Sequence, residues 1–224
     1  MVFAKNISII VFSKQSVMTG YQDYLIVLSP PESIISSVKK LKDFSFGKIG
    51  DYESRYSKAH ITVQPWPRKK PVWIEPLIPK LVRDLQSMPT AILDINGFSF
   101  FDQQETATIY AKLTSTPLTK IWFKTLRRFF SNENSEPHIT IARNLPKETF
   151  KELWPYFKNL QWNEQFKIEK LTFLRREMIG HDKIYKVFKE IPFNHRLDFY
   201  DFTTYKLKVP VLLNKVNTQQ ISLF

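Results

Sequence analysis

The spacing of hydrophobic and polar positions predicts a chain in which strands and helices alternate. Residues 21–29 are an apolar run that Pro30-Pro31 ends, which is typical of a strand. Residues 32–44 repeat apolar side chains at helical spacing and carry lysines on the other face. The same criteria predict further helices over 74–88, 118–130 and 147–158, and further strands over 59–64, 91–101, 105–114, 138–141, 165–176 and 183–191.

Two stretches of the sequence add to this prediction. Residues 106–114 alternate strictly between apolar and polar side chains, which predicts a sheet with one face in solvent. Residues 65–71 read Pro-Trp-Pro-Arg-Lys-Lys-Pro, and three prolines in so short a run argue against regular structure. We therefore expect a stiff basic loop after the strand at 59–64.

One short phrase occurs twice. His60-Ile61-Thr62-Val63 returns as His138-Ile139-Thr140-Ile141, 78 residues later. In a strand, alternate residues share a face, so His and Thr are neighbours on one face while the aliphatic residues point into a core. Imidazole gives or takes a proton near neutral pH, and a hydroxyl hydrogen-bonds an anionic oxygen. Two such strands would supply an acid, a base and an anion cradle.

The predicted elements around the two phrases form a repeat. Each half runs helix, motif strand, helix, strand, strand, and Tyr110 and Tyr185 follow their respective histidines by 50 and 47 residues. A single half would leave one sheet face uncovered, so pairing the halves buries surface. The fold class is therefore predicted as α+β: a bilobal pseudo-twofold duplication, each lobe an antiparallel sheet with helices on its outer face, and an active-site cleft between the lobes.

The amino-acid composition limits the kinds of catalytic group and partner that the chain can have. The chain of 224 residues has 43% hydrophobic residues, enough for a full core, and a formal net charge of +12, which favours a polyanionic partner such as nucleic acid. It has no cysteine, so disulfides, thiolate nucleophiles and thiolate metal ligands are excluded. Two histidines without a spaced acidic partner are too few ligands for a zinc centre. We therefore expect neither a metal nor a cofactor.

These motifs carry a family resemblance. The two His-x-Thr phrases, the proline before the second one (Pro137), and the terminal strand pair from Leu171 to Tyr185 resemble the two-histidine phosphoesterase superfamily, and most of all its 2′-5′ RNA ligase and cyclic phosphodiesterase branch. The resemblance covers about residues 21–193. It departs from the branch at Arg175-Arg176, where many relatives end the strand with a small hydroxyl residue.

The resemblance implies a metal-free phosphoesterase acting on 2′,3′-cyclic phosphates or 2′-5′ phosphodiester links in RNA or nucleotides. It implies that His60 and His138 are general acid and base, and that Thr62 and Thr140 hold the non-bridging oxygens. The candidate substrate-binding residues are Tyr110, Lys112, Arg143 and Arg68. Which histidine is the acid stays open, as does the choice between a cyclic RNA end, a 2′-5′ oligonucleotide and a small cyclic nucleotide. The alternative is an RNA-binding module of the same fold whose catalysis has lapsed.

The remaining expectations concern the ends and the setting of the chain. Residues 1–20 are predicted as an N-terminal extension, 21–193 as the phosphoesterase domain of two intertwined lobes, and 194–224 as a tail. Gln220-Ile221-Ser222-Leu223-Phe224 resembles the motif with which bacterial proteins bind the replication sliding clamp. His181 and His195 are expected to be structural or solvated. We expect a cytoplasmic monomer without a membrane segment, because the apolar run at 7–12 is too short to span a bilayer.

Overall fold

The computed structural model describes residues 20–130, 136–179 and 184–193. Its strands are β1 (Gln22–Leu28), β2 (Ile61–Lys69), β3 (Ala91–Asp102), β4 (Thr106–Leu113), β5 (His138–Pro146), β6 (Asn163–Ile168), β7 (Lys170–Glu177) and β8 (Lys186–Pro192). Its helices are α1 (Glu32–Ile49), α2 (Pro71–Ile74), the 3-10 helix Glu75–Leu77, α3 (Ile78–Leu85), α4 (Pro117–Arg128) and α5 (Lys147–Lys158). The expected N-terminal extension, except residue 20, and the expected tail with its clamp motif lie outside these residues and stay predictions, as do the expectations for His181 and His195.

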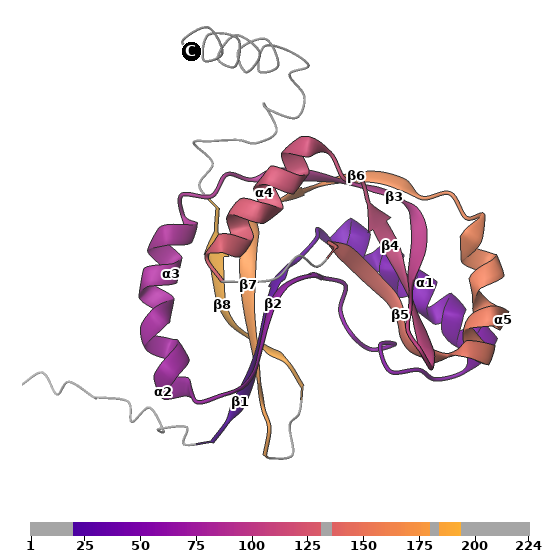
Figure 1. Ribbon diagram of the computed structural model, residues 1–224, viewed down its shortest axis with the longest axis horizontal. Coiled ribbons are helices and arrows are strands. Elements are labelled where there is room, and N and C mark those ends of the chain that lie inside the picture. Colours follow the sequence, from indigo (N-terminus) through magenta and orange to yellow (C-terminus); the bar gives the residue numbers. More distant parts are fainter. Residues whose placement is uncertain (1–19, 131–135, 180–183, 194–224) are drawn as a thin grey trace, which may run out of the picture.

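All eight strands belong to one antiparallel sheet in the order β6-β3-β4-β5-β2-β1-β7-β8. The sheet nearly divides at its centre, because β2 and β5 share only the pair Ile61 and Ile139. We call β2, β1, β7 and β8 the first lobe, and β5, β4, β3 and β6 the second lobe. Figure 1 shows the lobes spreading to either side of this junction, so the predicted bilobal α+β fold is confirmed.

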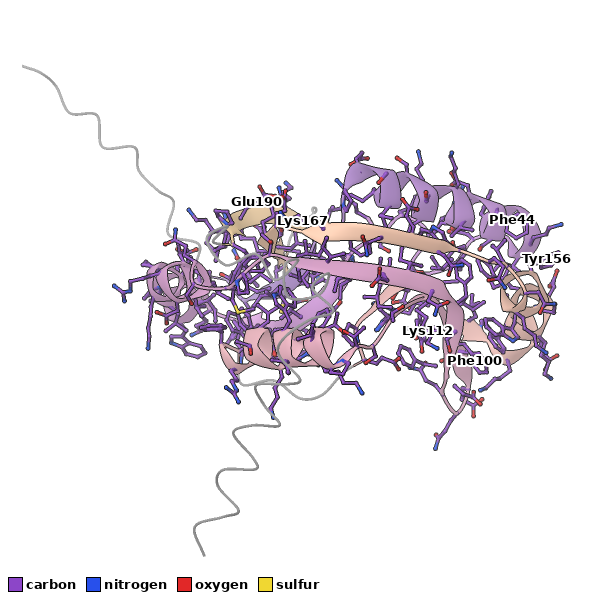
Figure 2. The ribbon with its side chains drawn as sticks, turned by 90° about the horizontal axis from the view of Figure 1, so that it is seen from above. Phe44, Phe100, Lys112, Tyr156, Lys167 and Glu190 are labelled. Atoms are coloured by element: carbon purple, nitrogen blue, oxygen red, sulfur yellow. The ribbon has the colours of Figure 1, made fainter. Side chains whose placement is uncertain are left out.

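Each lobe has its own helices on one face. Phe130, just after α4, packs on Phe173 of β7 with ring centroids 6.2 Å apart, and α4 and α3 lie beside the first lobe (Figure 1). Helix α5 packs on β3, β4 and β5 of the second lobe, and α1 packs on α5 and β5. Phe44 of α1 and Tyr156 of α5 meet at the outer end of that lobe, 5.5 Å between ring centroids (Figure 2). The predicted buried face of both motifs is confirmed, since Ile61, Val63, Ile139 and Ile141 are all buried.

The repeat differs from the predicted order. Strand β1 lies beside motif strand β2, and β4 lies beside motif strand β5 in the corresponding place. Each unit therefore runs strand, helix, motif strand, helix, strand: β1 to β3, then β4 to β7, where the second unit has the additional strand β6 before β7. The last strand of each unit crosses over, since β3 pairs with β4 in the second lobe and β7 pairs with β1 in the first. Tyr110 of β4 and Tyr185, which precedes β8, are not equivalent positions.

The expected loop over 65–71 was wrong, because β2 continues through both prolines to Lys69 and pairs with β1. Tyr24 faces Trp66 and Leu25 faces Pro65 across the two strands. On its other side β2 has left β5 after Ile61. A proline has no backbone N–H to donate. It is therefore tolerated in a strand where no neighbouring strand would accept that hydrogen bond. The end of β2 is such an edge.

Three further predictions need correction. Residues 74–88 form the end of α2, the 3-10 helix and α3 in place of one helix, with Pro76 and Pro79 near the breaks. The strand predicted over 165–176 is divided at Glu169 into β6 and β7, which pair in different lobes. Residues 106–113 are less exposed than their alternation implies, because Thr108 and Tyr110 on the polar face are buried. Tyr110 is paired with Thr140 across β4 and β5, so that face is the one that carries the second motif's threonine.

Among the described residues, no helix combines the length and hydrophobicity that a bilayer crossing needs.

Candidate active site

The two motifs are brought together by the one pair that joins the lobes. Ile61 and Ile139 are paired across β2 and β5 and are fully buried on the helix side. Neighbouring residues of a strand point to opposite faces. The His and Thr of each motif therefore face the open side of the sheet at the junction of the lobes.

Both imidazoles are held by the same local bond. Nδ1 of His60 lies 2.8 Å from the carbonyl oxygen of Lys58, and Nδ1 of His138 lies 2.8 Å from the carbonyl oxygen of Glu136. A carbonyl oxygen only accepts, so Nδ1 is the protonated nitrogen and donates in each ring. In the neutral ring Nε2 then carries the lone pair. Each histidine thus presents Nε2 as the nitrogen that takes or gives a proton.

Burial lowers the pKa of both imidazoles below the usual value. The hydrogen bonds to the carbonyls of Lys58 and Glu136 oppose this effect, and the Arg143 guanidinium adds to the lowering at both rings. The charges of Lys42 and His138 lower the pKa of His60 further, which indicates that the two rings are within electrostatic reach of each other. In the free protein both rings therefore favour the neutral form at pH 7.

A cavity of about 440 Å³ opens at the first motif. It brings together His60, Thr62, Thr140 and Arg143, four of the residues predicted from the sequence. It is also lined by residues that were not predicted as site residues: Leu25, Glu53, Ser54, Ser57, Lys58, Pro65, Arg176 and Tyr185. Two arginines and a lysine against a single glutamate give its lining an excess of positive charge. Such a lining attracts a phosphate.

Arg176 is fixed at this cavity from two sides. Its Nε and Nη2 lie 3.0 and 2.9 Å from Oδ2 of the nearly buried Asp23. The guanidinium carbon also lies 4.7 Å from the ring centroid of Tyr185. Asp23 accepts a hydrogen bond from the backbone N–H of Arg68 as well, at 2.9 Å. The departure of this chain at Arg175-Arg176 therefore places an ordered cation beside the candidate site.

The other predicted residues are not among those that line this cavity. His138 borders an aromatic cluster, with its ring centroid 4.8 Å from Phe101 and 5.1 Å from Tyr110. Lys112 is the cross-strand neighbour of His138 and is exposed on the second lobe (Figure 2). Arg68 is exposed near the end of β2 and does not line the cavity. Tyr110 and Lys112 thus accompany His138, whereas Arg68 lies farther along the first lobe.

A family model agrees with this arrangement of motifs. The model of the 2′-5′ RNA ligase superfamily matches residues 30–179, about two thirds of the chain. The chain belongs to this superfamily. Its two-histidine phosphoesterase fold, expected from the repeated motif, is thereby shown. No curated protein sequence matches the chain.

Solved structures of similar fold support the assignment of the fold. TT0787 of Thermus thermophilus superposes with a TM-score of 0.57 at 13% identity, over 78% of this chain and 100% of that one. The crystal structure of E. coli LigT complexed with 3′-AMP has a TM-score of 0.53 at 13% identity, over 77% and 98% of the two chains. LigT complexed with ATP gives 0.52 at 12% identity, over 78% and 99%.

This superfamily member supports its two motifs with a buried lysine. Nζ of Lys42 donates to the carbonyl oxygens of Ser54 and Ser57, both at 2.7 Å, and to Oγ of Ser57 at 2.8 Å. Ser54 Oγ in turn donates to the carbonyl of Ile141 and accepts from the N–H of Arg143 at 3.0 Å. Lys42 thus connects the loop that leads to His60 with the strand that carries His138. No sequence pattern indicated this role, since the helical spacing places lysines outward.

Metal ligands are not grouped in the described part of the chain. No set of three or more His, Cys, Asp or Glu side chains there is placed to hold a metal ion.

Proposed function

We propose that the chain is a metal-independent phosphoesterase that acts on RNA or nucleotides carrying a 2′,3′-cyclic phosphate or a 2′-5′ phosphodiester linkage. The observation that carries this proposal is the pair of imidazoles at the junction of the lobes, each held through Nδ1 by a carbonyl two residues earlier. Membership of the 2′-5′ RNA ligase superfamily supports the same class of substrate. A nucleotide is also the ligand named for the LigT structure with 3′-AMP.

Hydrolysis of a cyclic phosphate needs one proton acceptor and one proton donor. A water oxygen forms a bond to phosphorus while the bond from phosphorus to the ribose 3′ oxygen breaks. One neutral imidazole takes the proton of the water through Nε2, and the other, protonated, imidazole gives a proton to the departing 3′ oxygen. The product is a 2′-phosphomonoester, and the two rings exchange protonation states. Two imidazoles on opposite sides of phosphorus suit such an in-line displacement.

The negative charge on the phosphoryl oxygens requires hydrogen-bond donors and cations nearby. Thr62 and Thr140 line the cavity and have hydroxyls suited to donate to those oxygens. Arg143 and Arg176 contribute positive charge at the same cavity. The anionic phosphate would in turn raise the pKa of the neighbouring imidazoles, which offsets the lowering in the free protein. Binding of substrate therefore helps to protonate the acid.

The test is hydrolysis by the full chain in the presence of EDTA. We expect an oligoribonucleotide ending in a 2′,3′-cyclic phosphate to yield the 2′-phosphomonoester, identified by its phosphorus NMR signal. His60→Ala and His138→Ala should each lower kcat by roughly 10²–10⁴-fold while RNA affinity is retained, because each removes a proton-transfer group. His181→Ala is the matched control and should leave kcat unchanged.

Two outcomes would contradict this proposal. A requirement for added divalent metal would remove the metal-independent mechanism. Tight RNA binding by the unmodified chain without turnover of any of the substrates would instead favour the binding module with lapsed catalysis.

A further inference from the structure

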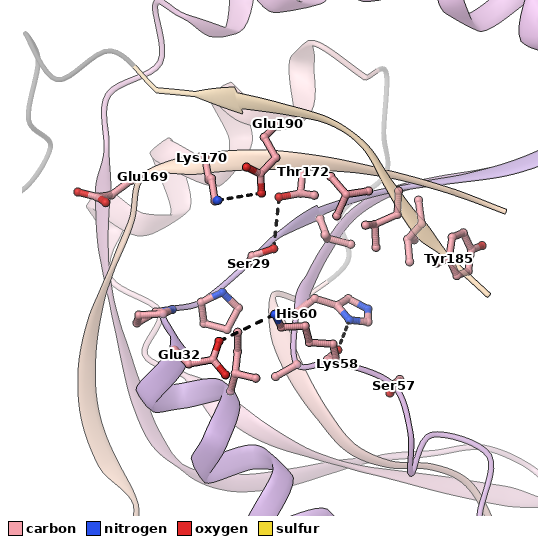
Figure 3. A pocket seen from close by; sticks show the side chains of 18 of the residues that line it. Ser29, Glu32, Ser57, Lys58, His60, Glu169, Lys170, Thr172, Tyr185 and Glu190 are labelled. Carbon is pink, nitrogen blue, oxygen red and sulfur yellow. Dashed lines mark hydrogen bonds and ion pairs between the residues drawn. The ribbon is translucent and has the colours of Figure 1, made fainter.

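A cavity of about 500 Å³ lies beside helix α4, away from the candidate active site. It is formed by α4, by the end of β4 with the residues that follow it, and by the two residues that precede β5. None of its lining residues lines the 440 Å³ cavity or the cavity of about 740 Å³ that His60 also borders (Figure 3). None of the site residues predicted from the sequence lines it either. We call it the α4 cavity.

Three cations of one helix face line the α4 cavity. Lys120, Lys124 and Arg127 stand at positions i, i+4 and i+7 of α4, so they lie along the same side of the helix. Like charges at this spacing lower the stability of a helix. Within the part of the chain that the structure describes, neither lysine forms an ion pair, and Glu136 is the only acid in the lining. The cavity therefore has a surplus of two positive charges.

The lysines around the 740 Å³ cavity are arranged differently. Lys170 lies 2.8 Å from Glu190, and Lys58 lies 3.9 Å from Glu32, as Figure 3 shows. The protein itself supplies the carboxylates that neutralise these cations. The surplus charge of the α4 cavity, by contrast, attracts an anion from solution.

The remaining lining of the α4 cavity suits an organic group. Leu113 and Phe123 are buried and contribute apolar surface, while Thr114 and Ser115 add hydroxyls. Arg127 is also buried, with its guanidinium carbon 5.5 Å from the ring centroid of Phe123. Sites for small organic ligands typically enclose roughly 300–1,000 Å³ and combine apolar walls with a few polar groups. The α4 cavity has this size and this composition.

The α4 cavity is connected to the second histidine by two residues. Glu136 and Pro137 line it and directly precede His138 in the chain. The carbonyl oxygen of Glu136 accepts the hydrogen bond from Nδ1 of His138 at 2.8 Å. Burial lowers the pKa of His138, and the negative charge of Glu136 opposes that lowering. A further negative charge close to Glu136 acts in the same direction.

We propose that the α4 cavity is an effector site for a small phosphomonoester, with the phosphate beside the three cations of α4 and the organic part against Leu113 and Phe123. A phosphomonoester carries close to two negative charges at pH 7, which matches the surplus of the cavity, whereas a carboxylate carries one. The bound ligand acts on His138 through Glu136 without entering the active site. This effect on turnover rests on the proposed function, and the binding itself does not.

Calorimetry with phenyl phosphate tests the binding, because this compound joins a phosphate dianion to a small apolar ring. We expect two binding events in the unmodified chain, one at the active site and one in the α4 cavity. The second event should be lost in the double variant Lys120→Gln with Lys124→Gln, and in Ser115→Trp, which fills the cavity from an exposed position. Benzoate, with one charge, should bind the α4 cavity at least roughly tenfold more weakly than phenyl phosphate.

Two further variants serve as controls for the binding experiment. Arg143→Gln should weaken the active-site event and leave the event in the α4 cavity unchanged, because Arg143 lines only the former cavity. Lys39→Gln with Lys40→Gln removes the same number of charges from exposed positions of α1 and should retain both events. Thermal melting verifies that each variant is folded.

Turnover of saturating 2′,3′-cyclic AMP at pH 8 tests the effect on His138, because saturating substrate keeps phenyl phosphate out of the active site. At this pH the imidazole favours the neutral form, since burial lowers its pKa. A higher pKa then protonates more of His138 if it is the acid, and makes it a stronger base if it is the base. Phenyl phosphate should therefore raise kcat at least twofold in the unmodified chain, and not in Lys120→Gln with Lys124→Gln.

The outcomes separate this inference from the proposed function. A single binding event in the unmodified chain, or a second event that the cavity variants retain, would overturn the inference. Two binding events with an unchanged kcat would overturn the effect on His138. If no substrate is cleaved while binding still depends on Lys120 and Lys124, the proposed function fails and the α4 cavity remains a phosphomonoester site.

Discussion

Arg143 is the residue whose charge acts on both histidines. It lowers the pKa of His60 and of His138, and it lines the cavity that contains Thr62 and Thr140. In the proposed mechanism its guanidinium therefore has two opposite effects. It keeps the imidazoles neutral in the free protein, and it offers positive charge to the phosphate in the complex.

Replacing Arg143 should separate these two effects. In the unmodified chain, both limbs of the kcat/KM profile should lie below the free imidazole pKa of about 6.5, because burial and Arg143 lower both values. Arg143→Gln removes a positive charge, so protonation becomes easier and both limbs move to higher pH. The maximal kcat/KM should fall at least roughly tenfold, because a charged phosphate contact is lost. Arg83→Gln on α3 is the control, and limbs that do not move in Arg143→Gln would contradict the prediction.

Lys42 is the second residue whose role is electrostatic, and it also stabilises the fold. Burial lowers its pKa to about 8 from 10.5. Lys42→Met removes the donor to two carbonyl oxygens, and should lower the free energy of unfolding by about 1–3 kcal/mol. Because the folded pKa is below the unfolded one, the unmodified chain gains stability as pH rises from about 8 towards 10.5. The methionine variant lacks this gain, so the difference between the two should widen with pH.

Urea unfolding at several pH values between 7 and 10 measures this difference. Lys39→Met, on the exposed side of the same helix, is the matched control and should show a constant difference. A gap between Lys42→Met and the unmodified chain that narrows as pH rises would show that Lys42 is not buried as a cation.

The four residues to which the proposed mechanism gives the central roles were predicted from the sequence alone. His60, Thr62, His138 and Thr140 stand in a repeated phrase, and a strand of alternating faces fixes their orientation. Arg176 and Lys42 were not predicted, because their roles depend on partners far along the chain. Arg176 is held by Asp23, 153 residues away, and Lys42 acts through the carbonyls of a loop. Contacts of that kind leave no periodic signal.

At the scale of elements, β2 shows why local sequence rules predicted a loop where the structure has a strand. Proline disfavours a strand only where its missing N–H would face a neighbour, and whether a neighbour exists depends on the divergence of β2 from β5. The end of β2 also contains a left-handed residue, Arg68, with φ of 52°. Its N–H is bonded to Asp23, which fixes the irregular pairing with β1 between Gln22 and Tyr24. Most other elements were predicted within a few residues, apart from the helix over 74–88, which is divided near Pro76 and Pro79, and the strand over 165–176, which is divided at Glu169.

Arg68→Gly tests the conformation of this strand end. A left-handed φ strains a residue with a side chain but not glycine, so the variant should gain up to about 1 kcal/mol in the free energy of unfolding. Lys69→Gly, in the next position without that φ, is the control and should lose stability. Thermal or urea unfolding measures both variants. A loss in Arg68→Gly as large as that in Lys69→Gly would contradict a left-handed Arg68.

At the scale of the whole molecule, the duplication was predictable and the exchange between its units was not. The two motifs and the succession of elements predicted two similar lobes, because a single unit cannot bury its sheet. The crossing of β3 and β7 into opposite lobes depends on which strands pair, and pairing is a long-range property. The same crossing brings Thr172 and Leu174 of β7 into the lining of a cavity of about 740 Å³ that His60 also lines. No sequence pattern therefore indicated this cavity.

The net charge of +12 predicts that affinity for nucleic acid depends on the length of the ligand. At the end of β2, Nζ of Lys70 lies 5.4 Å from the ring centroid of Tyr21 and 5.6 Å from that of Trp73, and both rings are exposed. With Arg68 and Lys69 they form a basic and aromatic strip at the far end of the motif strand. Such a strip binds single-stranded nucleic acid through phosphates and stacked bases.

Oligonucleotides should therefore bind more tightly than mononucleotides at low salt, and this advantage should decline as salt rises, because binding releases counterions. The effect is measured by fluorescence anisotropy of a labelled six-nucleotide RNA against salt, with a labelled mononucleotide for comparison. The His60→Ala variant is used because its turnover is expected to be slow. Lys69→Gln with Lys70→Gln should reduce the salt slope by roughly two, one for each lost phosphate contact. Lys39→Gln with Lys40→Gln, exposed on α1, is the matched control. Equal affinity for the two ligands at low salt would assign these lysines to solvation alone.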